Sequence, residues 1–449
     1  MTADLVIRRG RLPTLRRGPS DVVIVGGRVA GIFLNFRGPA TEELDAGGCD
    51  VLPGFMDSHV HLNEPGRTSW EGLETGTRAL AAGGVTSFFD MPLNSSPAVL
   101  TAEDFQRKAK IARKKSLIDF GLWGGLVPGN SGEIAGLAKA GVIGIKAFLC
   151  SSGIEDFPAV DARSLVLGAK ACAEAGLLLA LHAEDPGELE KFAYHAATGK
   201  DWRDFVRSRP ESCEVEAVRR ALQVAEQTGC RLHIVHVSAP GALELIAKAR
   251  TCGIDVTCET CPHYLLLRDS VMETLGAIAK CSPPLRSPAT VSKLWQALKQ
   301  HKILTIGSDH SPSPPAMKAG RPFLEAWGGI NGCQHAMPLF LQAARKRGIS
   351  WSAISSLLSN EVAHRFALPQ KGSIKIGKDA DLVILKHTTP EPIQKSGLFT
   401  RHPESAYAGM DLAWNVKATI VRGSPVFRDG KHHPNFRGQL LQPNTQNPT

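Results

Sequence analysis

The feature that most constrains the fold is a regular alternation of apolar runs of strand length with helix-like segments over residues 51–311. Segments such as "EGLETGTRALAAG" and "GALELIAKARTCG" separate the runs and have helical character. Strands joined by helical crossovers run parallel. Eight such units predict an α/β fold, a closed (β/α)8 TIM barrel, with an open doubly wound sheet as the alternative. The eight runs are "VLPGFMDSHVH", "VTSFFDM", "IDFGLWGGLV", "GIKAFL", "LLLALHAE", "RLHIVHVS", "DVTCETCPHYL" and "KILTIGSDHS".

The two ends of the chain have a different pattern, rich in short strands with glycine turns. The simplest account is a small composite β-sandwich built from residues 1–52 and 369–435, with the barrel of residues 53–368 inserted between them. The tail, residues 436–449, has few side chains to bury, so we expect it to be flexible.

Charge and cysteine content exclude several classes of protein. The net charge of +9 is spread thinly, and its densest cluster, "RKAKIARKK", lies on an amphipathic helical pattern, so nucleic-acid binding is not expected. A basic-surface binding protein remains an alternative that rests on the net charge alone. No run approaches the ~20 apolar residues of a membrane span, and the first residues do not resemble a signal peptide. Ten cysteines without a repeated spacing indicate reduced thiols and a cytoplasmic protein.

Polar residues stand where the predicted strands end. The carboxyl ends of barrel strands meet at one mouth, so these side chains should converge there. Any one of them alone is more simply a buried histidine, an ion-paired lysine or a helix cap, but their coincidence at strand ends favours a metal site. Residues two apart on an extended chain also share one face, as the first two do. The set is His59, His61, Lys146, His182, His236 and Asp309.

Lys146 is the unusual member, because a charged ammonium cannot bind a cation and is costly to bury without a partner. A neutral lysine can react with CO₂ to give a carbamate (N6-carboxylysine), which is an oxygen ligand able to bridge two metals. Imidazole and carboxylate ligands suit a divalent ion such as Zn²⁺, with iron, cobalt and manganese as alternatives. The residues thus favour two divalent metal ions bridged by modified Lys146.

These residues lie in motifs that resemble the cyclic amidohydrolases of the amidohydrolase superfamily, and among them the allantoinases. The resemblance runs from about Leu5 to Gly430 and is carried by "PGFMDSHVHLNEPGRTSWEG", "TSFFDMPLNSSP", "GIKAFLCSSGIEDFP", "HIVHVSAPGAL", "ETCPHYL", "KCSPPLR" and "GSDHSPSPP". It implies a metal-dependent TIM barrel with a composite β-sandwich.

The resemblance also implies a role for each ligand and a reaction. His59, His61 and Asp309 would hold one metal, His182 and His236 the other, and carboxylated Lys146 would bridge them. Asp309 would be the catalytic residue that takes a proton from the attacking water and passes it to the leaving nitrogen. The reaction would be hydrolysis of the hydantoin ring of allantoin to allantoate, a step of purine and ureide breakdown. Relatives are commonly tetramers, so the resemblance predicts a homo-oligomer, specifically a homotetramer.

Neighbouring residues bear on the choice of substrate. Dihydroorotases have an arginine two positions after the second histidine, where this chain has Asn63, and dihydropyrimidinases have a tyrosine shortly after the lysine, which this chain lacks. A neutral Asn63 suits an uncharged cyclic ureide, although it could instead brace the loop. Asn94 and Ser282 resemble positions that bind the ring amide, and Gly329 is expected to line the pocket through its backbone. The alternatives are a dihydroorotase, a dihydropyrimidinase or hydantoinase, and a non-catalytic scaffold.

Overall fold

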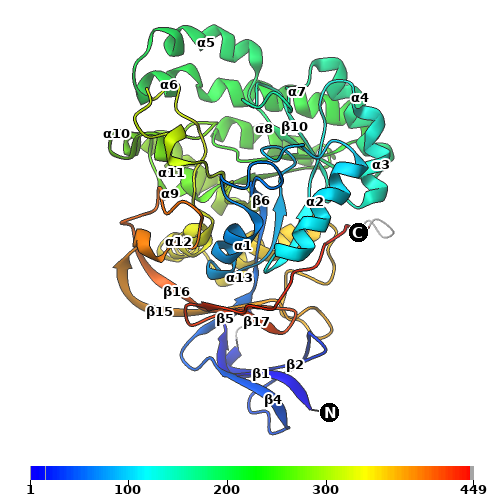
Figure 1. The fold of residues 1–449 in the computed structure, drawn as a ribbon, viewed down its shortest axis with the longest axis vertical. Coiled ribbons are helices and arrows are strands. Elements are labelled where there is room, and N and C mark those ends of the chain that lie inside the picture. The colour runs from blue at the N-terminus through cyan, green and yellow to red at the C-terminus, as the bar shows by residue number, and fades with distance from the viewer. Residues whose placement is uncertain (1, 16, 445–449) are drawn as a thin grey trace.

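The structure, a computed structural model, describes residues 2–15 and 17–444. Figure 1 shows a barrel with its helices stacked above a separate layer of strands, to which both ends of the chain contribute. The longest helical excursion, α5 to α7, lies at the end of the molecule opposite this strand layer (Figure 1).

Parallel strands form the barrel in the order in which they occur along the chain. The third predicted run contains two short strands in place of one. All lie within the predicted runs: β6 (Phe55–Val60), β7 (Val85–Asp90), β8 (Asp119–Leu122), β9 (Gly124–Gly125), β10 (Ile145–Phe148), β11 (Leu178–His182), β12 (Arg231–Ile234), β13 (Val256–Thr260) and β14 (Thr305–Ile306).

The last strand closes onto the first. Val60 and His310 form a parallel bridge, and the backbone N–H of His61 donates to the carbonyl of His310 at 2.8 Å. In addition, the backbone N–H of Ser308 donates to the buried Asp57 carboxylate at 2.9 Å. Closure brings residues that are 250 positions apart in the chain to the same mouth, and the predicted (β/α)8 barrel is confirmed.

Helices surround the barrel, and their ends follow local capping chemistry. In α2, for example, the Thr101 side chain accepts from the backbone N–H of Asp104, with acidic residues in the first turn and basic residues in the last. The helices are α1 (Leu73–Ala82), α2 (Ala102–Lys115), α3 (Ile134–Ala140), α4 (Ala162–Glu174), α5 (Pro186–Thr198), α6 (Trp202–Ser208), α7 (Glu211–Thr228), α8 (Pro240–Thr251), α9 (Pro262–Leu266), α10 (Met272–Leu275), α11 (Pro288–Lys299), α12 (Cys333–Lys346), α13 (Trp351–Ser355) and α14 (Glu361–Arg365).

Strands from both chain ends form the composite β-sandwich. Its N-terminal and C-terminal parts meet where β5 pairs with β15, with Val51 opposite Ile384. Both of these side chains are fully buried in a core separate from that of the barrel. The strands are β1 (Ala3–Leu12), β2 (Arg17–Val25), β3 (Arg28–Phe33), β4 (Ala40–Asp45), β5 (Asp50–Pro53), β15 (Leu382–Pro392), β16 (Asp411–Val421), β17 (Ser424–Arg428) and β18 (Lys431–His432).

Part of the tail that is predicted to be flexible pairs with the barrel. Residues 438–441 lie along the edge of β8, where the N–H of Phe120 donates to Gln439 O at 2.9 Å and its carbonyl accepts from Leu441 N at 2.7 Å. A Cβ atom at Gly438 would lie 1.7 Å from the carbonyl oxygen of Ile118, so only glycine permits this approach. The prediction considered side-chain burial alone, whereas backbone pairing with a strand edge holds the segment. Residues 445–449 lie outside the described residues.

Within residues 2–15 and 17–444, no helix combines the length and the apolar character needed to cross a lipid bilayer.

Candidate active site

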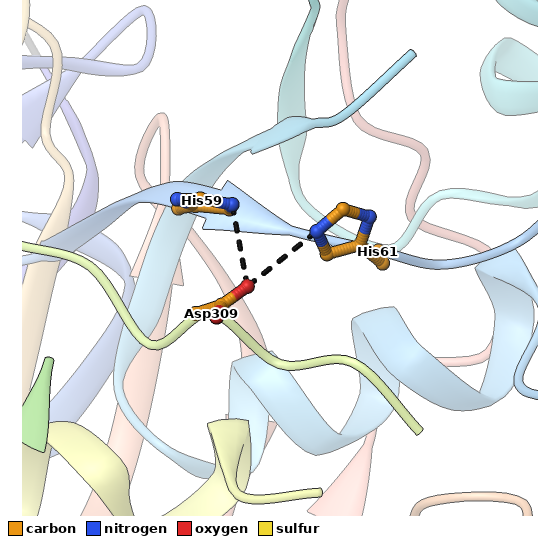
Figure 2. Close-up of side chains that lie close together, drawn as sticks. All are labelled: His59, His61 and Asp309. Atoms are coloured by element: carbon orange, nitrogen blue, oxygen red, sulfur yellow. Dashed lines mark ion pairs between the residues drawn. The ribbon is translucent and has the colours of Figure 1, made fainter. Parts of the chain in front are cut away.

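His59, His61 and Asp309 meet at the carboxyl ends of the first and last barrel strands. Figure 2 shows both imidazoles directed at the carboxylate. The Nε2 atoms of His59 and His61 lie 3.2 Å and 3.4 Å from the same oxygen, Oδ1 of Asp309. Their ligand atoms lie close enough together to hold one metal ion. The predicted grouping of these three residues therefore exists in the folded chain.

His182 and His236 form a second pair across the mouth. Nδ1 of His182 lies 3.0 Å from Nε2 of His236, and both rings are buried. Nε2 of His182 is 2.8 Å from Oε2 of Glu184, which is fully buried. The His59 and His236 rings are 5.4 Å apart, so the two histidine pairs are neighbours.

Lys146, in β10, is fully buried and its ammonium has no hydrogen-bond partner among the residues that the structure describes. Its Nζ lies 4.9 Å from the centre of the Phe148 ring. Burial lowers the pKa of Lys146 to about 7, so a large fraction of this amine is neutral near neutral pH. An ion pair with a barrel carboxylate was the simpler explanation for Lys146, and the described residues contain no such pair.

Asp309 is ionised in spite of its burial. Burial opposes its charge, but His59 and His61 outweigh that effect and lower its pKa to about 2. Burial lowers the pKa of His61 and His182 and holds that of His236 well below its usual value, which favours the neutral rings that can act as ligands.

The backbone at this mouth is strained. Positive φ angles occur at Asn63 (63°), Asn94 (66°), His236 (41°) and Asp309 (46°), none of which is a glycine. Such conformations cost about 1–3 kcal/mol each and concentrate at functional sites. These turns aim the side chains, and Asn and Asp are among the non-glycine residues that adopt such conformations most readily.

A cavity of about 340 Å³ opens at the mouth, within the range of small-molecule sites. Five of the six predicted ligands line it, all except Lys146: His59, His61, His182, His236 and Asp309. Asn94, Ser282 and Gly329, predicted to contact substrate, also line it. The Asn94 amide lies 3.4 Å from Nδ1 of His61.

Asn63 is not among the residues that line this cavity. It is buried, and its amide nitrogen donates weakly to the carbonyl of Pro312 at 3.4 Å. This contact favours the bracing role that was the alternative to substrate binding.

Two lysines form hydrogen bonds with the backbone N–H and carbonyl of Gly329. Its N–H donates to the carbonyl of Lys280 at 2.7 Å, and its carbonyl accepts from Nζ of Lys318. The Lys280 ammonium donates to the carbonyls of Phe323, Leu324 and Ala326 at 2.7, 2.9 and 2.7 Å. These bonds fix residues 315–329 as one wall of the cavity.

Sequence reasoning did not single out three functional residues of the mouth: Glu184, Arg209 and Glu259. Glu184 lies two residues after His182, and Glu259 lies inside "CETC". Both therefore stand near the ends of predicted strands, and that position could have identified them. Arg209 lies between α6 and α7, outside any strand, and only the fold brings it to the cavity.

The residues fit a bound metal centre. Buried nitrogen atoms of Lys146 and His236 have no hydrogen-bond partner within the described chain, although buried polar atoms normally do. Nitrogen and oxygen donors of this kind are the ligands that divalent transition metals prefer.

Comparisons with known proteins agree with this geometry. A model of the Amidohydrolase family matches residues 51–426. The chain belongs to the amidohydrolase family. Related proteins include the allantoinases of Deinococcus radiodurans, 46% identical with 99% of each chain covered, and of Rubrobacter xylanophilus, 43% identical with 98% of each covered. The L-hydantoinase (dihydropyrimidinase) of Arthrobacter aurescens has a similar structure, with a TM-score of 0.94, 31% identity, and 98% of this chain and 100% of that chain covered. The resemblance to allantoinases seen in the sequence motifs is confirmed.

Proposed function

We propose that this protein is an allantoinase, which hydrolyses the hydantoin ring amide of allantoin to give allantoate. The observation that carries the proposal is the convergence of four histidines and Asp309 on one small cavity, with Lys146 buried against Phe148 of its lining, in a chain that shares its full length with allantoinases. Hydantoinases have a similar structure, so opening of a related cyclic amide is the second candidate.

Two divalent metal ions, zinc by default, would complete the site. His59, His61 and Asp309 would hold one ion and His182 and His236 the other, with Lys146 as a carbamate between them. Such ions supply activation of the attacking water and polarisation of the ring carbonyl. The neutral fraction of Lys146 supports the carbamate, because only an uncharged amine reacts with CO₂.

The protein's own groups then handle the proton and the ring. Asp309 is anionic at neutral pH, so its carboxylate can take a proton from the attacking water and return it to the leaving ring nitrogen. Asn94 and Ser282 line the cavity with groups that can hydrogen-bond the ring amide. Gly329 shapes the wall, but its N–H is already donated to Lys280.

The decisive experiment is a substrate panel with known metal content. Purified protein should open allantoin faster than hydantoin, dihydrouracil or dihydroorotate, lose activity to a chelator and regain it with zinc. Faster turnover of dihydroorotate would contradict the proposal, and a folded protein with less than one metal equivalent would favour a non-catalytic scaffold.

Assembly and location belong to the same proposal. We expect a homotetramer in the cytoplasm, with no nucleic-acid partner. All ten cysteines are unpaired, as expected in a reducing compartment. Gel filtration with light scattering measures the assembly.

A further inference from the structure

The cavity contains a guanidinium that the predicted site did not include. Arg209 lines the cavity, and its Nη1 donates to Oε2 of Glu184 at 2.6 Å. The same carboxylate oxygen lies 2.8 Å from Nε2 of His182. Arg209 is therefore two hydrogen bonds away from a predicted metal ligand, and its side chain keeps 23% of its exposure toward the cavity.

The backbone of Arg209 is held in place. Its carbonyl accepts from Nη1 of Arg286 at 2.6 Å, and its N–H donates to Val206 at 3.2 Å. Arg286 is itself buried and paired with Glu214 at 2.7 Å. Because these hydrogen bonds hold the backbone of Arg209, the residue loses little further conformational freedom when its guanidinium binds a ligand.

The guanidinium also keeps donors for a ligand. It carries five N–H groups, and within the described chain its side-chain partners are Glu184 and the Cys150 thiol, which cannot use all five. Lys280, the other cation that lines the cavity, differs because its three donors are matched by the three carbonyls of residues 323, 324 and 326.

We infer that Arg209 is a specificity-determining residue that donates hydrogen bonds to the ureido substituent of the substrate. This assignment rests on the proposed function, since allantoin is a hydantoin with a ureido group on the ring carbon next to the hydrolysed carbonyl. A ureido oxygen is a strong neutral acceptor and suits the planar fork of a guanidinium. The alternative is that Arg209 only pairs with Glu184 and thereby orients His182.

The two roles predict different results for two ligands. The affinity for allantoin is measured as its KM, and the affinity for unsubstituted hydantoin as a competitive inhibition constant, which does not require that hydantoin is opened. The quantity compared is the ratio of the KM for allantoin to the inhibition constant for hydantoin. When both are measured on one preparation, this ratio does not depend on how much of the protein is folded or metal-loaded. In Arg209→Met, the KM for allantoin should rise about 10–100-fold while the constant for hydantoin changes less than about threefold, as expected for loss of a charge-assisted hydrogen bond.

Arg209→Lys tests the same point with the Glu184 ion pair retained, and should shift the ratio in the same direction. The control is Arg207→Lys, at an exposed arginine of the preceding helix, α6, which should change neither constant. Equal weakening of both ligands, or no change in either, would overturn the assignment. If the wild-type protein opens hydantoin but not allantoin, the proposed function fails and the assignment with it, whereas wild-type turnover of allantoin with an unshifted ratio removes the assignment alone.

Discussion

Nδ1 of His59 lies 2.6 Å from Oε1 of Glu259, and both side chains are fully buried. Ser58 donates to the other oxygen of Glu259 at 2.6 Å. Burial opposes the charge of Glu259, but His233 and His59 outweigh it and lower its pKa, so the carboxylate can only accept. Nδ1 of His59 therefore carries a proton, and Nε2, which faces Asp309, is the nitrogen that a metal ion could use.

This arrangement predicts that Glu259→Gln weakens metal binding. The amide is a poorer acceptor for His59, so affinity should fall about 10–100-fold, the usual effect of losing such a partner. Competition with a chelator measures it. Glu244→Gln, at an exposed residue paired with Lys302, is the control and should not change the affinity. Unaltered metal affinity in Glu259→Gln would contradict this role.

Lys146→Ala should lower kcat by at least about 100-fold, the scale expected for loss of one catalytic group. Because the proposed bridge is an oxygen donor, added acetate should restore part of the activity and a small amine should not. Steady-state assays and metal analysis measure both effects. Lys170→Ala, at an exposed lysine of α4, should behave as wild type. Rescue by the amine would argue against the carbamate.

The wall formed by residues 315–329 should become more stable as the pH rises from about 8 to about 10. Burial, with a smaller contribution from Arg209, lowers the pKa of Lys280 to about 8. Burial also lowers the pKa of Lys318 to about 8, with Cys281 and Glu404 opposing this and Lys280 adding to it. These values lie below the unfolded-state pKa of about 10.4, so the ordered wall releases its protons first and its stability rises with pH over that range.

Hydrogen-exchange protection factors, corrected for the intrinsic effect of pH, measure this change. Those of residues 315–329 should rise between about pH 8 and 10, while those of α7 stay constant. Lys280→Met removes one of the two titrating ammonium groups, so the rise should be smaller in this variant. A flat or falling profile in the wild-type protein would contradict the lowered pKa values of the two lysines.

Lys371→Met should destabilise the fold by about 3–5 kcal/mol, because it leaves the buried Asp381 carboxylate without a counter-ion, whereas Asp119 keeps Arg422. Nζ of Lys371 lies 2.7 Å from Asp119 of β8, 2.7 Å from Asp381 and 3.0 Å from Asp379. Burial opposes its charge, but these carboxylates outweigh it and raise its pKa. This contribution is complete below the unfolded-state pKa of about 10.4 and is lost only at higher pH.

Denaturant unfolding at neutral pH measures the loss. Lys375→Met, four residues away and exposed, should change the free energy of unfolding by less than about 0.5 kcal/mol. Equal stability of the two variants would contradict the role of Lys371.

The barrel and the convergence of these side chains at its mouth were predictable because topology converts sequence order into position. Once His182 and Asp309 stand at the ends of parallel strands, closure of the barrel brings them together whatever the details of the loops. Arg209 was not predictable in this way, since it follows a helix of an excursion whose path depends on tertiary contacts such as that with Arg286. The position of residues 438–441 was not predictable for a related reason, because it depends on backbone pairing with β8, which composition does not record.

The pairing of β5 with β15 has a consequence for how the protein is made. About 330 residues separate these strands, so at roughly 5–20 residues per second the ribosome needs on the order of 15–70 seconds between them. During that interval one side of β5 exposes unpaired amide and carbonyl groups while the barrel emerges behind it. Nascent chains of this protein should therefore depend on chaperone protection of the N-terminal strands until β15 leaves the exit tunnel.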